Sequence, residues 1–150
     1  MKIAIASDHR GFDLKVKILA ELGDKYDITD LGTYSSEQAD YTKYAFKVGE
    51  GVAKQDFNRG ILICGSGIGM SIACNKVKAI RCARVCSKED AYYTRNDNDA
   101  NVIAFGEKFT PEEAIEIIET FINTPFSGVD RYIKRINDIT LYEQGAYHDR

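Results

Sequence analysis

The sequence is poor in several kinds of residue and segment, and each shortage excludes a class of protein. No run approaches the ~20 apolar residues that would span a bilayer, and the "IAIAS" that follows Met1-Lys2 is too short for a secretory signal. The 20 basic and 23 acidic residues are intermixed, so no basic block can neutralise a nucleic-acid backbone. We therefore expect a soluble, cytoplasmic protein that binds neither membranes nor nucleic acid.

Histidine is also scarce, which argues against a metal site. The chain has two histidines, His9 and His148, and its four cysteines include no Cys-x-x-Cys pair. Structural zinc sites draw on cysteine and histidine ligands at such short spacings, so we expect no metal. Cys74, Cys82 and Cys86 are interpreted as small hydrophobic side chains of the core.

The residues that are present fit one domain. The chain has 150 residues, 44% of them hydrophobic. A chain of this length can bury roughly 70% of the surface that its unfolded form exposes. No linker, repeat or low-complexity segment divides it, so we predict a single domain over residues 1–150.

Short β-rich runs alternate with segments of helical periodicity along the chain. The predicted strands are Lys2 to Ser7, Tyr26 to Asp30, Gly60 to Cys64, Ile80 to Val85 and Asn101 to Phe105. Apolar residues recur at helical spacing over 14–22 and 45–52, and a further helix begins near Ile68.

The clearest helix start is at Thr110. Thr110 can cap the helix, Pro111 suits its first turn, and Glu113 completes a capping box. A last, more polar helix is expected over Gly128 to Leu141. Alternating strands and helices imply right-handed crossovers and a parallel sheet with helices on both faces. We predict an α/β fold: a three-layer, Rossmann-like α/β/α sandwich on five parallel strands, with an extra C-terminal helix.

Ligands of such sheets bind beyond the carboxyl ends of the strands. The loop after the third predicted strand reads "CGSGIG", Cys64 to Gly69. Its glycines allow a tight turn that presents backbone N–H groups where a helix begins, a setting that binds anions and favours a thiolate. The alternative is that Cys64, at the end of a buried strand, is a packing residue.

Three better-known loops do not fit these letters. Met70 stands where a Walker A loop needs lysine and where a Cys-x5-Arg phosphatase loop needs arginine. Cys64 stands two residues before Ser66, where a nucleophile elbow needs glycine. Each of these alternatives is therefore excluded by one residue.

Five motifs, in order along nearly the whole chain, resemble one family. They are "SDHRGF" at 7–12, "DLGTYSSEQADY" at 30–41, "ICGSGIGMSIACNKV" at 63–77, "RNDNDANVIAFGEK" at 95–108 and "DRYIKRI" at 130–136. This set is similar to the motifs of type B ribose-5-phosphate isomerases and the related galactose-6-phosphate isomerase subunits. The resemblance implies interconversion of aldose and ketose sugar phosphates without a metal or other cofactor.

The resemblance also implies catalytic roles for the glycine-rich loop. Cys64 would be the base that moves a proton between neighbouring carbons through an enediolate. The amides of Gly65, Gly67 and Gly69 would hold the enediolate oxygen, and Ser66, in place of the usual threonine, would pass a proton between the two oxygens. Some members use a glutamate at the position of Met70, which this chain lacks.

Further positions implied by the resemblance bind the sugar and its phosphate. Asp8 would orient hydroxyl groups, although a carboxylate there can equally cap the next helix. Tyr41 would lie beside the sugar, or else simply pack. By the same resemblance, His9, Arg131 and Arg135 would bind the phosphate. The two arginines are one helical turn apart, so both can reach one dianion, although such a pair is ordinarily a solvated face.

The same resemblance implies an assembly with shared sites. Asn98 and Lys108, the latter in place of the usual arginine, match positions that reach into the site from another subunit. We therefore expect a homodimer, with a tetramer as the alternative.

Some letters depart from the family pattern, and they bear on the substrate. Asp97 replaces the histidine that usually opens the sugar ring, and Tyr132 stands where a histidine often follows the first phosphate arginine. Proline is missing after Tyr41 and after Val77. Ribose 5-phosphate is the expected substrate. The alternatives are a tetrose 4-phosphate, galactose or allose 6-phosphate, and a noncatalytic module that binds a sugar phosphate or nucleotide.

Overall fold

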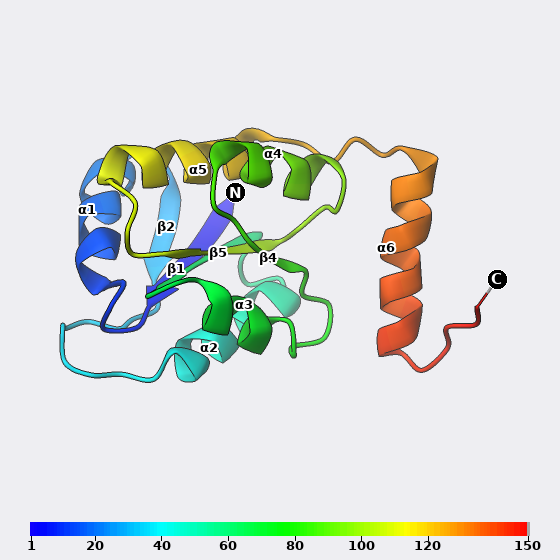
Figure 1. The fold of residues 1–150 in the computed structure, drawn as a ribbon, viewed down its shortest axis with the longest axis horizontal. Coiled ribbons are helices and arrows are strands. Elements are labelled where there is room, and N and C mark those ends of the chain that lie inside the picture. The colour runs from blue at the N-terminus through cyan, green and yellow to red at the C-terminus, as the bar shows by residue number, and fades with distance from the viewer. Residues whose placement is uncertain (150) are drawn as a thin grey trace.

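Five parallel strands form the centre of the protein (Figure 1). The structure is a computed structural model that describes residues 1–149. Its strands are β1 (Lys2–Ser7), β2 (Asp27–Asp30), β3 (Arg59–Cys64), β4 (Cys82–Arg84) and β5 (Val102–Gly106). Their order across the sheet is β2-β1-β3-β5-β4, and every neighbouring pair is parallel. The predicted five-stranded parallel sheet is confirmed.

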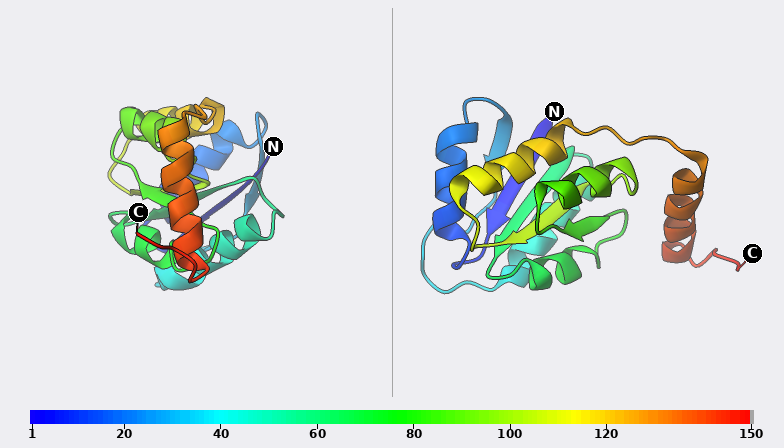
Figure 2. Two further views of the ribbon diagram at one scale, coloured as in Figure 1. Left: turned by 90° about the vertical axis from the view of Figure 1, so that its right-hand side faces the viewer. Right: turned by 45° about the horizontal axis from the view of Figure 1, so that its top comes forward.

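Helices cover both faces of this sheet. They are α1 (Phe12–Leu22), α2 (Tyr41–Ala53), α3 (Ile68–Cys74), α4 (Lys88–Asn96), α5 (Pro111–Asn123) and α6 (Asp130–Glu143). Helices α1, α4 and α5 lie on one face and α2 and α3 on the other (Figures 1 and 2). The last helix, α6, belongs to neither layer, which confirms the predicted sandwich with an extra C-terminal helix.

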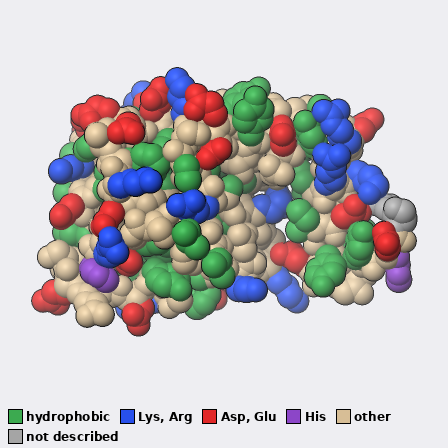
Figure 3. Space-filling model, in the orientation of Figure 1, with side chains coloured by type: hydrophobic (Ala, Val, Ile, Leu, Met, Phe, Trp, Pro, Cys, Tyr) green, Lys and Arg blue, Asp and Glu red, His purple; other side chains and the backbone are tan. Residues whose placement is uncertain are grey.

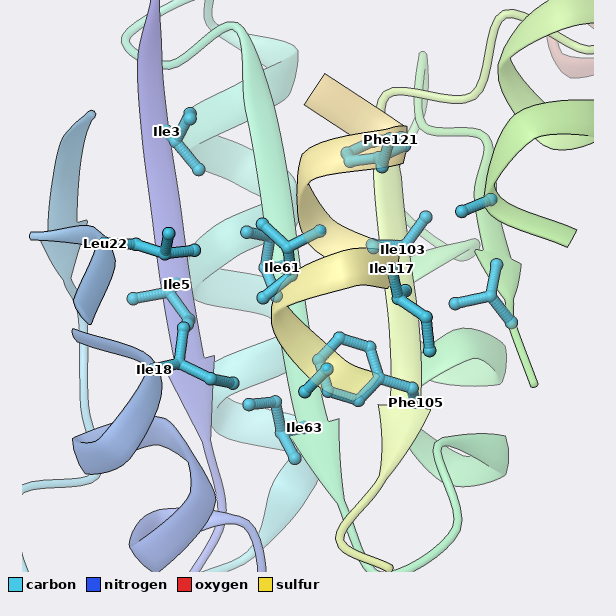
Figure 4. Close-up of a cluster of buried hydrophobic side chains, with 14 of the residues drawn as sticks. Ile3, Ile5, Ile18, Leu22, Ile61, Ile63, Ile103, Phe105, Ile117 and Phe121 are labelled. Atoms are coloured by element: carbon cyan, nitrogen blue, oxygen red, sulfur yellow. The ribbon is translucent and has the colours of Figure 1, made fainter. Parts of the chain in front are cut away.

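The central strands are buried on both faces, and successive side chains enter two separate cores. In β3, Ile61 and Ile63 face α1 and α5 (Figure 4). Leu62 and Cys64 face α2 and α3. Cys64 is therefore the last residue of a buried strand on the α2 and α3 side, where its thiol meets the loop that follows.

Local signals explain where two of the helices begin. The predicted capping box of α5 is present: the Thr110 hydroxyl accepts from the Glu113 amide at 3.2 Å, and the Glu113 carboxylate accepts from the Thr110 amide at 3.3 Å. Helix α4 is absent from the expected elements, although its start signal is in the sequence. Ser87 caps it by accepting from the Asp90 amide at 3.1 Å.

The strand predicted over Ile80 to Val85 is shorter than expected, and this corrects the assignment of one cysteine. Strand β4 ends at Arg84, so Cys86 lies beyond the sheet and is exposed, which makes its assignment to the core wrong. Cys74 is buried and Cys82 half-buried. A hydrogen bond with Cys74, together with burial, raises the pKa of the Cys82 thiol.

Helix α6 stands apart from the rest of the chain. An extended segment over 124–129 leads to it, and none of its residues is buried (Figures 1 and 2). The Ala79 amide donates to the Glu143 carboxylate at 3.1 Å. A cavity of about 470 Å³ otherwise separates α6 from β4 and α4, and it is visible as a hollow in Figure 3.

Across residues 1–149, each helix is too short or too polar to cross a membrane.

Candidate active site

The loops that follow β1, β3 and β5 meet at the carboxyl edge of the sheet. Ser7 is the register partner of Ile63, and Cys64 is the partner of Gly106. The residues that come next are therefore neighbours, although they lie far apart in sequence. They include Asp8 after β1 and Glu107 after β5.

Cys64 is held against the backbone of its own loop. Its thiol sulfur accepts a hydrogen bond from the Gly67 amide at 3.1 Å, and the residue is 4% exposed. Gly67 has a φ of +80°, and a Cβ there would lie 2.7 Å from the Phe105 Cα. Only glycine fits this position without a shift of the backbone. The turn therefore fixes an N–H group on the sulfur.

The remainder of the loop leads into α3 and toward α2. The Ser66 hydroxyl accepts from the Ile68 amide at 3.2 Å, which leaves its own proton available for a ligand. The ring of Tyr41 packs on Gly69, where a Cβ would lie 2.7 Å from the ring. Tyr41 thus packs on the glycine-rich loop, and its ring is partly exposed.

Asp8 is buried and takes part in the turn before α1. Its Oδ1 accepts from the amides of Arg10 at 3.0 Å and Gly11 at 3.1 Å. This geometry matches the structural role considered for Asp8. It engages only one of the two carboxylate oxygens, so a second role toward a ligand is compatible with it.

His9 is fixed by the loop that follows β2. Its Nδ1 lies 3.2 Å from both the amide nitrogen and the carbonyl oxygen of Ala39. Either neutral tautomer therefore finds a partner at Nδ1. The ring is half-buried and its orientation is set by the chain.

Two other predicted pairs of site residues lie away from this loop. Asp97 and Asn98 follow the end of α4, where the Asp97 carboxylate accepts from the Asn96 side chain at 2.8 Å. Arg131 and Arg135 are exposed on α6, and Figure 3 shows the basic side chains gathered at the upper end of this helix. A single chain therefore does not bring these four residues to Cys64.

Lys108 lies next to the glycine-rich loop of its own chain. It lines a cavity of about 110 Å³ with Gly65 and Ser66 of its own chain. The register places it there, because Gly106 pairs with Cys64 and Lys108 follows two residues later. The pairing of β5 with β3 thus carries it next to the Cys64 to Gly69 loop.

Comparison with known proteins identifies the fold and loop arrangement. The profile of a family described as Ribose/Galactose Isomerase matches residues 3–139. The chain belongs to the ribose/galactose isomerase family. This confirms the resemblance carried by the five sequence motifs.

Individual members of this isomerase family match over nearly their full length. The chain is 42% identical to the ribose-5-phosphate isomerase B of Escherichia coli, covering 95% of this chain and 97% of the relative. The solved isomerase B of Clostridium thermocellum has a TM-score of 0.93 and 39% identity, with 97% and 99% covered. The isomerase B of Mycoplasma genitalium, solved with bound ribulose 5-phosphate, has a TM-score of 0.88 and 39% identity, with 95% and 96% covered.

Arg10 and Glu107 are site neighbours that the sequence analysis did not single out. The Arg10 guanidinium lies over Gly65, where a Cβ would be 2.9 Å from its Nη1. Glu107 holds it there through an ion pair of 2.5 Å between Nη2 and Oε1. Both residues stand inside the motifs quoted above, Glu107 directly after β5 and Arg10 three residues after β1, and that position was the available signal.

Arg84 is a third neighbour that was missed. It is the last residue of β4, and its Nε donates to the Ser66 carbonyl at 2.9 Å. The rule that ligands lie beyond the carboxyl ends of strands points to Arg84 as well. Its true strand end was hidden by the overlong strand predicted over Ile80 to Val85.

Proposed function

We propose that this chain is an aldose–ketose isomerase that converts ribose 5-phosphate to ribulose 5-phosphate, with Cys64 as the base. The observation that carries the proposal is the buried Cys64 thiol with the Gly67 amide on its sulfur. Family membership and a relative solved with ribulose 5-phosphate support the substrate.

The chemistry needs one base and one anion-binding loop. The Cys64 thiolate removes the proton from C2 of the open-chain aldose, and the electron pair moves into an enediolate. The same thiol returns the proton to C1, which leaves a ketone at C2. Ser66 moves a proton between O1 and O2, and the carbon skeleton neither gains nor loses an atom.

Loop amides stabilise the charge that develops on oxygen. The Gly67 N–H is directed at the sulfur and the Ile68 N–H at the Ser66 hydroxyl. The first-turn amides of Gly69 and Met70 have no acceptor within α3, because a helix leaves its first N–H groups unpaired. We assign the enediolate oxygen to this part of the Gly65 to Gly69 segment.

Substrate contacts come from the surrounding loops. Asp8 orients the sugar hydroxyls with the oxygen that the α1 turn leaves free, and Tyr41 lies beside the sugar chain. His9, held by Ala39, and Lys108, which lies next to Gly65 and Ser66, bind the phosphate end from the same subunit. Arginine binds phosphate through two parallel hydrogen bonds, which neither histidine nor lysine can do. We therefore expect arginine side chains to complete the phosphate-binding site.

The arginines of the clamp come from a second copy of the chain. Arg131 and Arg135 stand on α6, which carries no buried residue and exposes Ile133, Ile139 and Tyr142. A helix with such a face is stabilised when a partner covers it. We therefore propose a homodimer, with a tetramer as the larger alternative, in which α6 and the Asp97-Asn98 turn of one subunit complete the site of the other.

A tetrose 4-phosphate is the second candidate substrate, and Asp97 favours it. Pentose phosphates exist mostly as rings, and opening a ring needs a group that both donates and accepts a proton near neutral pH. A tetrose 4-phosphate cannot close a furanose ring through its blocked O4. An enzyme with Asp97 at the ring-opening position should therefore act better on a substrate whose ring does not need to be opened.

The four cysteines and the phosphorylated substrate fit a reducing, cytoplasmic setting.

The test is an assay of purified protein against tetrose, pentose and hexose phosphates, with Cys64→Ala beside it. Cys64→Ala should lose about three decades in kcat while still binding substrate, because a general base alone contributes roughly 10²–10⁴-fold. Cys86→Ala is the matched control, since it removes an exposed thiol that lies beyond β4. Near wild-type turnover in Cys64→Ala would exclude the base assignment, and no turnover of any sugar phosphate by wild type would favour the noncatalytic module.

A further inference from the structure

One peptide unit of the catalytic loop carries a cation at one end and the Cys64 sulfur at the other. Arg84 Nε donates to the Ser66 carbonyl oxygen at 2.9 Å. The amide of the same unit, on Gly67, donates to the Cys64 sulfur at 3.1 Å. Residues from two strands, β4 and β3, are thus joined through a single Ser66–Gly67 peptide.

The direction of these two hydrogen bonds means that the cation at the carbonyl oxygen strengthens the N–H donor of the same peptide. The Ser66–Gly67 peptide is trans, so its C=O and N–H point in opposite directions. A positive group at the oxygen draws electron density toward the carbonyl and makes the N–H a stronger donor. A stronger donor favours the negative form of its acceptor, which here is the sulfur.

We propose that Arg84 is a positioning residue that stabilises the Cys64 thiolate through the Ser66–Gly67 peptide. The guanidinium bonds the loop carbonyl rather than the thiol. It holds the carbonyl on the β4 side of the loop, and this keeps the Gly67 N–H on the sulfur. The inference rests on the proposed role of Cys64 as the base.

Other charged and titratable groups lie around the Cys64 loop on each neighbouring element. Asp8 comes from the loop after β1, and Tyr44 packs in the same core cluster from α2. Arg10 lies over Gly65 with Glu107, which follows β5. Helix α3 contributes no charged residue. A change at Arg84 leaves all of these in place, so a difference between wild type and variant isolates its contribution.

Arg84 is exposed, which limits the size of the effect. Solvent screens an exposed charge, so one such contact changes an equilibrium only modestly. The proposed effect of Arg84 therefore depends on its hydrogen bond to the Ser66 carbonyl and not on its charge alone. Lysine keeps the charge but lacks the planar fork that reaches the oxygen through Nε.

The experiment measures the thiolate directly. The rate of iodoacetamide alkylation at Cys64 is followed against pH by mass spectrometry of the Cys64 peptide, which separates it from the exposed Cys86. Wild type, Arg84→Met, Arg84→Lys and Lys88→Met are compared. Lys88 is a matched control, because it is an exposed cation on α4 that pairs with Glu116 and not with the loop.

The expected result is a shift in the pH at which alkylation is half-maximal. In Arg84→Met this midpoint should move up by about half a pH unit, the size expected for one solvent-screened contact. Arg84→Lys should move it in the same direction by less, and Lys88→Met should leave it at the wild-type value. An unchanged midpoint in Arg84→Met, or an equal shift in Lys88→Met, overturns the proposal.

Two further readouts keep the outcome decisive. Circular dichroism checks the fold of each variant, and Arg84→Gln replaces Arg84→Met if the latter does not fold. The acidic limb of kcat/KM against pH should shift together with the alkylation midpoint. If alkylation shifts and kcat/KM does not, the link between Arg84 and the thiolate stands and the proposed role of Cys64 as base fails.

Discussion

Lys15 and Asp30 form an ion pair of 2.6 Å in which the lysine side chain is fully buried. The Lys15 ammonium also donates to the Thr33 carbonyl at 2.5 Å and lies 5.5 Å from the ring centre of Tyr34. Helix α1 is thereby tied to the loop after β2. The same loop contacts His9 through Ala39. The Lys15–Asp30 ion pair therefore helps to hold His9 in place.

Lys15→Met should therefore loosen that loop. The change leaves the Asp30 carboxylate and the Thr33 carbonyl without their shared donor. Removal of one partner from a fully buried pair costs about 3–5 kcal/mol, and we expect about 2–3 kcal/mol here because Asp30 is partly exposed. Urea unfolding measures the loss. Lys17→Met, on the exposed face of α1, is the control, and an equal small effect in both variants would contradict the prediction.

Gly67→Ala should disable the loop more than it destabilises the protein. An alanine at φ +80° is strained, and its Cβ would press on the Phe105 backbone. The Gly67 N–H then leaves the sulfur, and kcat/KM should fall by about 10² or more. Gly145→Ala is the control, because Gly145 has a φ of +70° with nothing within 4 Å. If both variants keep full activity, the amide is not needed by the thiol.

Mixed dimers test whether two chains share each site. Cys64→Ala and the double change Arg131→Ala with Arg135→Ala should each be inactive alone. Random reassembly of the two makes about half of the dimers mixed, and each mixed dimer has one site with both elements intact. The mixture should therefore recover about a quarter of wild-type activity. Activity equal to the sum of the separate variants would show that each subunit is complete in itself.

Asp97→His tests the ring-opening position. A histidine can both protonate the ring oxygen and accept the anomeric proton near neutral pH, whereas an aspartate normally only accepts. We expect kcat/KM for ribose 5-phosphate to rise by roughly 10-fold, with little change for erythrose 4-phosphate. Asp97→Asn, which removes the charge without adding an acid or base, is the control. No gain with histidine would mean that the ring is opened elsewhere.

Glu119 makes the stability depend on acid pH. Hydrogen bonds from Lys25, at 2.6 Å, and from the Tyr26 hydroxyl, also at 2.6 Å, lower the pKa of its carboxyl. A carboxyl whose pKa is lower in the folded protein stabilises the fold fully at pH values above its unfolded-state pKa. This stabilisation is lost as pH falls through the folded-state pKa. Glu119→Gln should lower stability at pH 7 by no more than about 1 kcal/mol. The difference from wild type should shrink as pH falls and vanish once Glu119 is protonated in the folded protein too, and a constant difference across pH would contradict the assignment.

The sequence predicts those parts of the fold that depend on short-range patterns. The capping box at Thr110 and the buried run that ends at Cys64 need only a few neighbouring letters, and both are confirmed. Helix α4 was missed because its polar sequence has a weak apolar stripe, although Ser87 and Asp90 mark its start. Short-range patterns alone were thus sufficient for most elements.

Contacts between distant segments were harder to predict. Arg84 reaches Ser66 only because β4 ends at that residue, and Lys108 reaches the loop only because β5 pairs with β3. Neither the end of β4 nor the pairing of β5 with β3 can be deduced from the local pattern of apolar residues. The sequence motifs nevertheless named the loop from Cys64 to Gly69, since its glycines and thiol follow one buried strand directly.

The two outer strands determine how copies of this protein can associate. Strand β2 has four residues and β4 has three, and they form the two edges of the sheet. Edges this short offer few unpaired backbone groups to an incoming strand, so the sheet resists being extended by another chain. In the proposed homodimer the contacts would then come from side chains on helices, and the separate helix α6 can be exposed without creating the continuous sheets that lead to aggregation.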